Sequence, residues 1–339
     1  MTPSHYTQIV LASRPATSAF IEADHFRKEV VPFDLKPQKG QVLIRVQYLS
    51  IDPAMRLWLS ETGTPLTPIP IGGVMHAIGV GAVIASGENT SLVPGDLVSG
   101  NLGMAEYTIQ DANAVEKLEP PPNMQALDYI GLLAHIGLAA YFGLVDIAQI
   151  KAGETLVVSG AAGATGSIVC QLGKERGAKV IGISGSTKKC EWLEQELGID
   201  KALNYKSPTF KDDFSKTVGA LDVFYDNVGG EVLDLALAST NLHARIIICG
   251  NLSQYNTEKQ YPLRNYSQLL SKRATMRGFI VFDYTSRYEE GREYLAELVT
   301  KGAVKQRYHV LNGLDIAPGA IGMLFRGENE GKLVVKVSD

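Results

Sequence analysis

A glycine-rich segment is the part of the sequence whose spacing points most directly to chemistry. Residues 159–167 read SGAAGATGS; they follow the apolar, strand-like run 155–158 and open a helix-like stretch that reaches about residue 176. Glycine lets the backbone approach a pyrophosphate closely, and a helix N-terminus offers unpaired N–H groups with partial positive charge. The position between strand and helix therefore predicts a dinucleotide site around Gly163 and Gly166. A tight turn without a ligand is the alternative.

The end of the next predicted strand indicates which dinucleotide this is. An NAD site usually places an Asp or Glu about 20 residues after the glycines, where it binds the ribose hydroxyls. Here the strand 178–184 is followed by Gly-Ser-Thr and then Lys188 and Lys189, without an acid. Hydroxyls and cations suit the 2′-phosphate of NADP. Alternatively, the two lysines are only the solvated start of the next helix.

The elements that must position these residues fall into two patterns. The first 120 residues are short strands with Gly and Pro between them, which favours a compact β barrel or sandwich. From about Met124, apolar strands alternate with helices, which predicts a parallel sheet covered on both faces. After about residue 303 short strands return; we expect them to fold back onto the first domain, although they could extend the central sheet. The predicted domains are 1–123 with 304–339, and 124–303.

Composition limits the class of protein. The chain has 339 residues, more than one comfortable core, and a net charge of 32 − 36 = −4, so nucleic-acid binding is not expected. Its three cysteines, Cys170, Cys190 and Cys249, are too scattered for a disulfide framework and fit a reducing compartment. The apolar stretch 129–145 is short for a membrane span and suits a buried helix. No signal peptide is evident, and we expect a cytoplasmic protein without a membrane segment.

Two other reaction types find little support in the sequence. No cysteine precedes Cys170 and His76 is followed by Ala77, so the ligand spacing of a zinc dehydrogenase is missing and no metal is expected. Without a Lewis acid, negative charge on a carbonyl oxygen must be met by hydrogen-bond donors. Tyr255 and Lys259 have the Tyr-x-x-x-Lys spacing of short-chain dehydrogenases. They lie in a predicted loop long after the glycine turn, which argues against that family.

Seven blocks in order resemble one family over nearly the whole chain. They are YLSIDPAMR (48–56), AAGATGS (161–167), ALNYK (202–206), YDNVGG (225–230), CGNLSQYN (249–256), RGFIVFDY (277–284) and RGENEGKLVVKV (326–337). With these blocks the chain resembles the zinc-independent medium-chain dehydrogenases/reductases, in particular the NADPH-dependent alkenal double-bond reductases and leukotriene B4 12-hydroxydehydrogenases (prostaglandin reductases). Two departures are Ala54, where the family often has Tyr, and one extra residue between Lys189 and Tyr205.

The resemblance implies an α/β fold, with a Rossmann-type doubly wound parallel sheet and a GroES-like β-rich catalytic domain, and an active site in the cleft between them. It assigns NADPH/NADP+ as the cofactor. Residues Gly163, Ala164, Thr165 and Gly166 would hold the pyrophosphate, and Lys189 with Tyr205 the 2′-phosphate. The nicotinamide half would be lined by Asn227, Cys249, Gly250, Ser253, Tyr255, Phe279, Ile280, Val281 and Asn329. A homodimer is also implied.

The family reaction is reduction of the C=C bond of an α,β-unsaturated aldehyde or ketone by hydride transfer to the β-carbon. Tyr255 is our candidate donor to the carbonyl oxygen, because a phenol stays protonated at pH 7; it could instead only hydrogen-bond the nicotinamide ribose. Tyr48 and Tyr284 are candidate substrate residues, and each could equally be an ordinary structural tyrosine. An NADPH-dependent quinone reductase and a non-catalytic NADPH-binding protein are the alternative functions.

Overall fold

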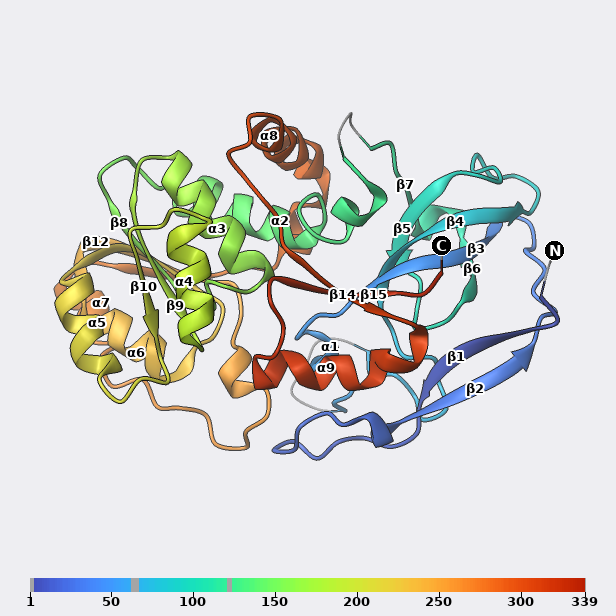
Figure 1. Cartoon of the computed structure of the whole chain (residues 1–339), viewed down its shortest axis with the longest axis horizontal. Coiled ribbons are helices and arrows are strands. Elements are labelled where there is room, and N and C mark those ends of the chain that lie inside the picture. The colour runs from blue at the N-terminus through green and yellow to red at the C-terminus, as the bar shows by residue number, and fades with distance from the viewer. Residues whose placement is uncertain (1–2, 62–66, 121–123, 339) are drawn as a thin grey trace. The chain divides into compact units, whose positions relative to one another are not determined.

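The chain forms two compact units in a computed structural model that describes residues 3–61, 67–120 and 124–338. Unit 1 comprises Met1–Gly131 and Tyr308–Asp339, and unit 2 comprises Leu132–Arg307. The chain therefore leaves unit 1 and returns to it, a few residues later than the boundaries predicted from the sequence. Figure 1 shows both units as ribbons.

Unit 2 contains a six-stranded parallel sheet (Figure 1). Its strands run in the order β10-β9-β8-β11-β12-β13. The order reverses direction between β8 and β11, which makes this pair the switch point of a doubly wound sheet. The predicted parallel sheet is confirmed. The strands are β8 (Thr155–Val158), β9 (Lys179–Ser184), β10 (Lys201–Asn204), β11 (Leu221–Asp226), β12 (Thr240–Ile248) and β13 (Thr275–Gly278).

Helices connect these strands and cover both faces of the sheet. Because crossovers between parallel strands are right-handed, α3 and α4 lie on one face, and α5 and α6 lie on the other. The helices are α2 (His135–Ala140), α3 (Ala164–Glu175), α4 (Thr187–Gln195), α5 (Phe210–Val218), α6 (Gly230–Ala238), α7 (Gln268–Ser271) and α8 (Tyr288–Thr300), with a π-helix η4 (Tyr141–Ile147) and 3-10 helices η5 (Leu252–Gln254) and η6 (Val281–Arg287).

Burial on both faces explains why the strands of unit 2 are nearly continuous apolar runs. Strand residues such as Val157 and Phe224 are fully buried, and α5 adds Phe214 to the same core. The apolar stretch expected to form a buried helix is indeed buried over Ile136–Leu144, but it forms α2 followed by the π-helix. No helix among the described residues is long and apolar enough to cross a membrane.

Unit 1 is built around a seven-stranded sheet (Figure 1). Its order is β14-β15-β3-β4-β5-β7, with β6 also paired to β3, and β1 with β2 forms a separate two-stranded sheet. The elements are β1 (His5–Leu11), η1 (Ala23–His25), β2 (Phe26–Pro32), β3 (Gln41–Ser50), α1 (Met55–Trp58), β4 (Ile78–Ser86), β5 (Leu97–Asn101), β6 (Tyr107–Asp111), η2 (Ala112–Ala114), β7 (Glu116–Lys117), η3 (Ala126–Tyr129), β14 (Tyr308–Asn312), η7 (Leu314–Ile316), α9 (Ala317–Arg326) and β15 (Lys332–Lys336).

The last strand joins the sheet of unit 1 and not the parallel sheet. Strand β15 pairs antiparallel with β3, so that Val334 lies opposite Ser50 and Lys336 lies opposite Tyr48. This pairing shows that the chain returns to its N-terminal domain, as the strand pattern predicts. It also completes the core of unit 1, since Leu333 and Val335 are buried in it.

A buried lysine holds the turn that follows β3. Lys332 is only 1% exposed, and its ammonium group donates to the Ile51 carbonyl at 2.9 Å and to the Asp52 carboxylate at 2.9 Å. The Ser50 hydroxyl donates to the second oxygen of the same carboxylate. Burial lowers the pKa of Lys332, and Asp52 opposes that shift. Each polar group in this cluster therefore depends on another for its hydrogen bonds.

We expect Lys332→Met to destabilise unit 1 by roughly 3 kcal/mol, because it leaves the Asp52 carboxylate without its cation. Urea unfolding followed by circular dichroism would measure the loss. Adding Asp52→Asn should recover part of it, and Lys39→Met, at an exposed position, should stay within about 0.5 kcal/mol of the unsubstituted protein. Equal stability of the Lys332 and Lys39 variants would contradict this account of the buried pair.

Candidate functional site

The glycine segment forms the turn between β8 and α3, as the sequence predicts. Gly160 has a φ of 59°, in the left-handed region, and Gly163 is the N-cap residue of α3. A Cβ on Gly166 would lie 2.3 Å from the Gly160 carbonyl oxygen, and one on Gly163 would lie 3.1 Å from the same atom. The turn can therefore wind this tightly only because these positions lack side chains.

The N-terminus of α3 is suited to an anion. Its N-cap makes no side-chain capping hydrogen bond, and no acidic residue lies in its first turn. The first main-chain bond of the helix runs from the Ser167 N–H to the Gly163 carbonyl at 3.0 Å. The N–H groups of residues 164–166 precede that bond, and such groups with the helix dipole favour a phosphate. The residues present thus fit the pyrophosphate of a dinucleotide.

A buried carboxyl group joins the two strands of the switch point. Asp226, at the end of β11, accepts hydrogen bonds from the Ser159 hydroxyl at 2.6 Å and from the N–H groups of Val228 and Gly229, each at 3.0 Å. Burial raises the pKa of Asp226, while these hydrogen bonds act in the opposite direction. The carboxyl ends of β8 and β11 are therefore fixed to each other through one side chain.

The same serine holds Asn227, one of the predicted cofactor residues. The Asn227 N–H donates to the Ser159 hydroxyl oxygen at 2.8 Å, and the Asn227 side-chain amide donates to the Ser159 carbonyl at 2.7 Å. Both bonds cross from β11 to β8. The orientation of Asn227 is thus set by the residue that precedes the glycine turn.

The predicted segment Cys249–Tyr255 is attached to this switch point by its backbone. The N–H groups of Cys249 and Gly250 donate to the Asp226 carbonyl at 2.8 and 3.0 Å. Ser253 donates to the Val228 carbonyl from its N–H at 3.0 Å and from its hydroxyl at 2.7 Å. The structure thus brings the ends of β8, β11 and β12 together along one edge of the sheet.

Tyr255 follows the 3-10 helix η5 and is half-buried. Burial raises the pKa of its phenol, although a hydrogen bond from the Asn251 backbone opposes the shift. A hydrogen bond that lowers the pKa of a phenol is one that the phenol oxygen accepts. The bond from Asn251 therefore leaves the proton of the Tyr255 hydroxyl available for donation. The group therefore stays protonated at neutral pH, as a hydrogen-bond donor must.

The segment Phe279–Val281 begins directly after β13. The Phe279 N–H donates to the Ile248 carbonyl at 3.4 Å, which keeps this segment beside the end of β12. The Phe279 ring meets the Tyr284 ring edge-on at 6.3 Å, and Tyr284 stacks on Phe142 at 4.6 Å. The predicted strand over 274–281 ends early, at Gly278, because the 3-10 helix η6 starts at Val281.

Lys189 and Tyr205 lie at the ends of the two strands on the other side of β8. Lys189 is in the first turn of α4, where its N–H donates to the N-cap hydroxyl of Ser186 at 3.3 Å. The Tyr205 N–H donates to the Ser184 carbonyl at 3.0 Å, and its ring packs against Gly185, where a Cβ would lie 3.1 Å from it. Both residues therefore lie near the carboxyl ends of the neighbouring strands β9 and β10.

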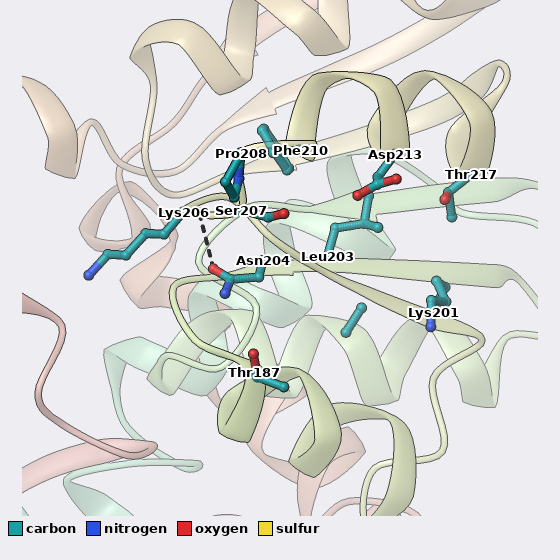
Figure 2. Close-up of a pocket in the computed structure, with 11 residues that line it drawn as sticks. Thr187, Lys201, Leu203, Asn204, Lys206, Ser207, Pro208, Phe210, Asp213 and Thr217 are labelled. Atoms are coloured by element: carbon teal, nitrogen blue, oxygen red, sulfur yellow. Dashed lines mark hydrogen bonds between the residues drawn. The ribbon is translucent and has the colours of Figure 1, made fainter.

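A pocket of about 640 Å³ lies next to this region, along the outer strand β10 (Figure 2). Figure 2 shows Thr187, at the start of α4, and Asn204, at the end of β10, on its walls, and Asp213 on the side of α5. The Lys206 N–H donates to the Asn204 side-chain oxygen at 3.0 Å, which shapes the loop above the pocket. None of the predicted cofactor residues lines this pocket.

Two predicted residues belong to unit 1. Tyr48 is half-buried on β3, opposite Val80 and Lys336. Asn329 is buried, and its side-chain amide donates to the Gly331 carbonyl at 2.8 Å. All other predicted site residues lie in unit 2. Their roles stay predictions.

Known proteins match both parts of the chain. Residues 7–118 match the family model described as the N-terminal domain of oxidoreductase, and residues 164–300 match that of zinc-binding dehydrogenase. The NADPH-dependent curcumin reductase of Escherichia coli is 35% identical, over 97% of this chain and 96% of its own. The chain belongs to the medium-chain dehydrogenase/reductase superfamily.

Further members of the superfamily agree with this assignment. The NADP+-dependent 2-alkenal reductase of Nicotiana tabacum is 35% identical, with 91% of each chain covered. The crystal structure of CurA from Vibrio vulnificus in complex with NADPH has 37% identity and a TM-score of 0.91, and the match covers 98% of this chain and 99% of CurA. The expected family and fold class are therefore confirmed.

The description "zinc-binding" attached to one matched model raises the question of metal ligands in this medium-chain reductase. Within residues 3–61, 67–120 and 124–338, no three His, Cys, Asp or Glu side chains are grouped so that they could hold a metal ion. Cys170 and Cys190 are buried, and Cys249 is partly buried; all three are free thiols.

Sequence reasoning missed the residues that hold the site in place. Ser159 and Asp226 each stand directly at the end of an apolar strand, and a polar residue at that place in a parallel sheet is a usable signal. The hydrogen bond between their side chains joins residues 67 positions apart in the sequence. No local pattern predicts such a pair.

We expect Gly166→Ala to destabilise unit 2 by about 1–3 kcal/mol, because the added Cβ would meet the Gly160 carbonyl and overpack the turn. The matched control is Gly319→Ala in α9, where a Cβ would meet nothing within 4 Å. That substitution should be neutral or stabilise by about 0.5–1 kcal/mol. Urea midpoints of the two variants provide the comparison, and a Gly166 variant as stable as the control would refute the packing argument.

Proposed function

We propose that this protein reduces the C=C bond of α,β-unsaturated aldehydes and ketones with NADPH. The observation that carries the proposal is the glycine turn at the N-terminus of α3, placed at the switch point and linked there to Asp226 and Asn227. The activities named for its 35%-identical relatives, curcumin reductase and 2-alkenal reductase, support the substrate class. CurA, a structural neighbour, was crystallised with NADPH, which supports the cofactor.

In this proposal the adenosine end of the cofactor lies at the ends of β9 and β10. Residues 184–190 contain no acid, so nothing there repels a 2′-phosphate. Lys189 supplies a cation from the first turn of α4, and Tyr205, a residue that is 48% exposed, supplies a ring. This pair selects NADPH over NADH, because a charge-assisted hydrogen bond to phosphate is absent with NADH.

The nicotinamide end is assigned to Asn227, Cys249, Gly250, Ser253, Phe279, Ile280 and Val281, and to Asn329 in unit 1. When bound, NADPH supplies the hydride that is transferred to the β-carbon of the substrate. The support for this assignment is that the first seven residues follow the ends of β11, β12 and β13. Ligands of doubly wound sheets bind at the carboxyl ends of the strands.

Tyr255 is the proposed donor to the substrate carbonyl oxygen. Negative charge collects on that oxygen when a hydride reaches the β-carbon, so a hydrogen bond to it strengthens in the transition state. The raised pKa of Tyr255 keeps the hydroxyl protonated. Tyr48 and Tyr284 are assigned to substrate binding. The Tyr284 hydroxyl already accepts a hydrogen bond from Arg277 at 3.5 Å, which orients its ring.

A homodimer is part of the same proposal. Strand β13 is the last strand of the parallel sheet, and all four of its residues are exposed. Leu270, on α7 just before it, is 83% exposed, and Met276 on the strand itself is 40% exposed. An open strand edge flanked by exposed apolar side chains suits pairing with a second copy.

We also propose a cytoplasmic location, which the three free thiols support.

The experiment that tests the function is a substrate panel with NADPH. Alkenals, enones and quinones would be offered separately, with cofactor oxidation followed at 340 nm and products identified by mass spectrometry. We expect saturated aldehydes and ketones. Hydroquinone as the main product would favour a quinone reductase. NADPH binding without turnover of any class would favour a non-catalytic binding protein.

We expect Lys189→Ala to raise the KM for NADPH by about 10- to 100-fold, because it removes one charge-assisted bond of about 1.5–3 kcal/mol. The KM for NADH should hardly change, since NADH has no 2′-phosphate. The adjacent Lys188→Ala, at an exposed position on the same turn, is the control and should alter neither value. An equal loss with both cofactors would exclude a phosphate-binding role for Lys189.

We expect Tyr255→Phe to lower kcat by about 100-fold or more, the usual cost of losing one donor to a developing oxyanion. The Kd for NADPH, from fluorescence titration, should change by less than about twofold. Since the protonated phenol is the active form and its pKa is raised, activity should fall only as the pH rises past the usual tyrosine value. Tyr266→Phe, at a residue that is 65% exposed, is the control. An undiminished kcat would remove Tyr255 from the mechanism.

A further inference from the structure

A fully buried tyrosine lies beneath the segments assigned to the nicotinamide end. Tyr225, on β11, is 0% exposed, and its hydroxyl donates to the Ala139 carbonyl of α2 at 2.8 Å. Burial raises the pKa of Tyr225, and the neighbouring Cys249 thiol, directly after β12, adds to that shift. One hydroxyl therefore connects the central strand to α2, and the Cys249 thiol lies beside it.

The π-helix η4 closes tightly over this tyrosine. A Cβ on Gly143 would lie 2.5 Å from Tyr225 Cε2, 2.8 Å from the Tyr225 hydroxyl oxygen and 3.0 Å from Phe279 Cζ. The two distances to Tyr225 are shorter than real Cβ contacts, and the distance to Phe279 is tighter than nearly all of them, so Gly143 is the residue that lets Tyr225 and Phe279 both pack against the helix backbone. The position of Phe279 is thus defined by the π-helix and by the phenol under it.

Other residues of the π-helix are held by η6. Phe142 stacks on Tyr284, and the guanidinium of Arg287 lies 5.3 Å from the centre of the Phe142 ring. Arg287 also forms an ion pair with Asp146 of the π-helix at 2.9 Å. With the helix held by η6 in this way, a change at Tyr225 acts on Phe279, which packs against the same glycine.

We propose that Tyr225, together with Gly143, is a positioning residue that holds Phe279 and Cys249 in place for the nicotinamide half of the cofactor. This inference rests on the proposed function, because the role of Phe279 and Cys249 is part of it. Tyr225 itself touches neither cofactor nor substrate. Its effect is confined to the nicotinamide end, since Lys189 and Tyr205 follow strands on the other side of β8.

The test is Tyr225→Phe, which keeps the ring and removes only the hydroxyl. Loss of one hydrogen bond should lower kcat for alkenal reduction by about 10-fold. The binding of the two cofactor halves is measured separately by calorimetry. Reduced nicotinamide mononucleotide should bind about 10-fold more weakly. The Kd for 2′,5′-ADP, the adenosine half, should remain within about twofold. If Tyr225 only supported the fold, the substitution would not weaken mononucleotide binding while leaving 2′,5′-ADP binding unchanged.

Two further variants make the outcome decisive. Gly143→Ala drives a Cβ into Tyr225 and Phe279. It should also weaken binding of reduced nicotinamide mononucleotide and leave binding of 2′,5′-ADP unchanged. The control is Tyr294→Phe on α8, whose hydroxyl accepts from Arg176 at 3.1 Å and donates to Glu175 at 3.1 Å; it should leave all three measurements unchanged.

If Tyr225→Phe weakens both halves equally, or leaves kcat and mononucleotide binding unchanged, the proposal is overturned. Failure of this inference can be told apart from failure of the proposed function. If the unsubstituted protein reduces no alkenal, the proposed function fails, while the binding of the two halves still tests Tyr225. Should Gly143→Ala not fold, the Tyr225 and Tyr294 pair still decides the question.

Discussion

The arrangement of unit 2 depends on one buried carboxyl group, that of Asp226. A carboxylate removed from water costs several kcal/mol unless hydrogen bonds replace its hydration, and each bond to a charged group contributes about 1.5–3 kcal/mol. Asp226 receives such bonds from Ser159, Val228 and Gly229. The last of these comes from a glycine with a φ of 72°, a conformation that other residues rarely adopt. The carboxyl group and the loop around it therefore require each other.

Much of the fold could be predicted because its signals are local. The strand, glycine turn and helix at 155–175 follow one another directly, so their residue types specify them without knowledge of distant partners. Features that depend on distant partners were missed. The sequence gives no sign that Lys332 is buried, since lysines are almost always exposed, and its partner Asp52 lies 280 residues away. The π-helix η4, within the apolar stretch after His135, was likewise not predicted.

The candidate site shows the same limit. The resemblance assigned Asn227, Cys249 and Phe279, and the structure places all three after the ends of adjacent strands. It does not test what they bind. The supporting residues escaped prediction because their function lies in pairing across the sheet. Tyr225 reads as an ordinary residue of an apolar strand, and only its hydrogen bond to Ala139 distinguishes it from a phenylalanine.

Both units use a buried ionisable side chain for the same physical task. A turn at the end of a strand leaves backbone groups that need partners where no neighbouring strand continues. In unit 2 Asp226 accepts from the N–H groups of its own turn. In unit 1 Lys332 donates to the Ile51 carbonyl of the turn after β3. Each side chain matches the group to be satisfied, since N–H groups need an acceptor and a carbonyl needs a donor. A neutral side chain would make fewer or weaker bonds, and these turns would lose the fixed geometry that a binding edge requires.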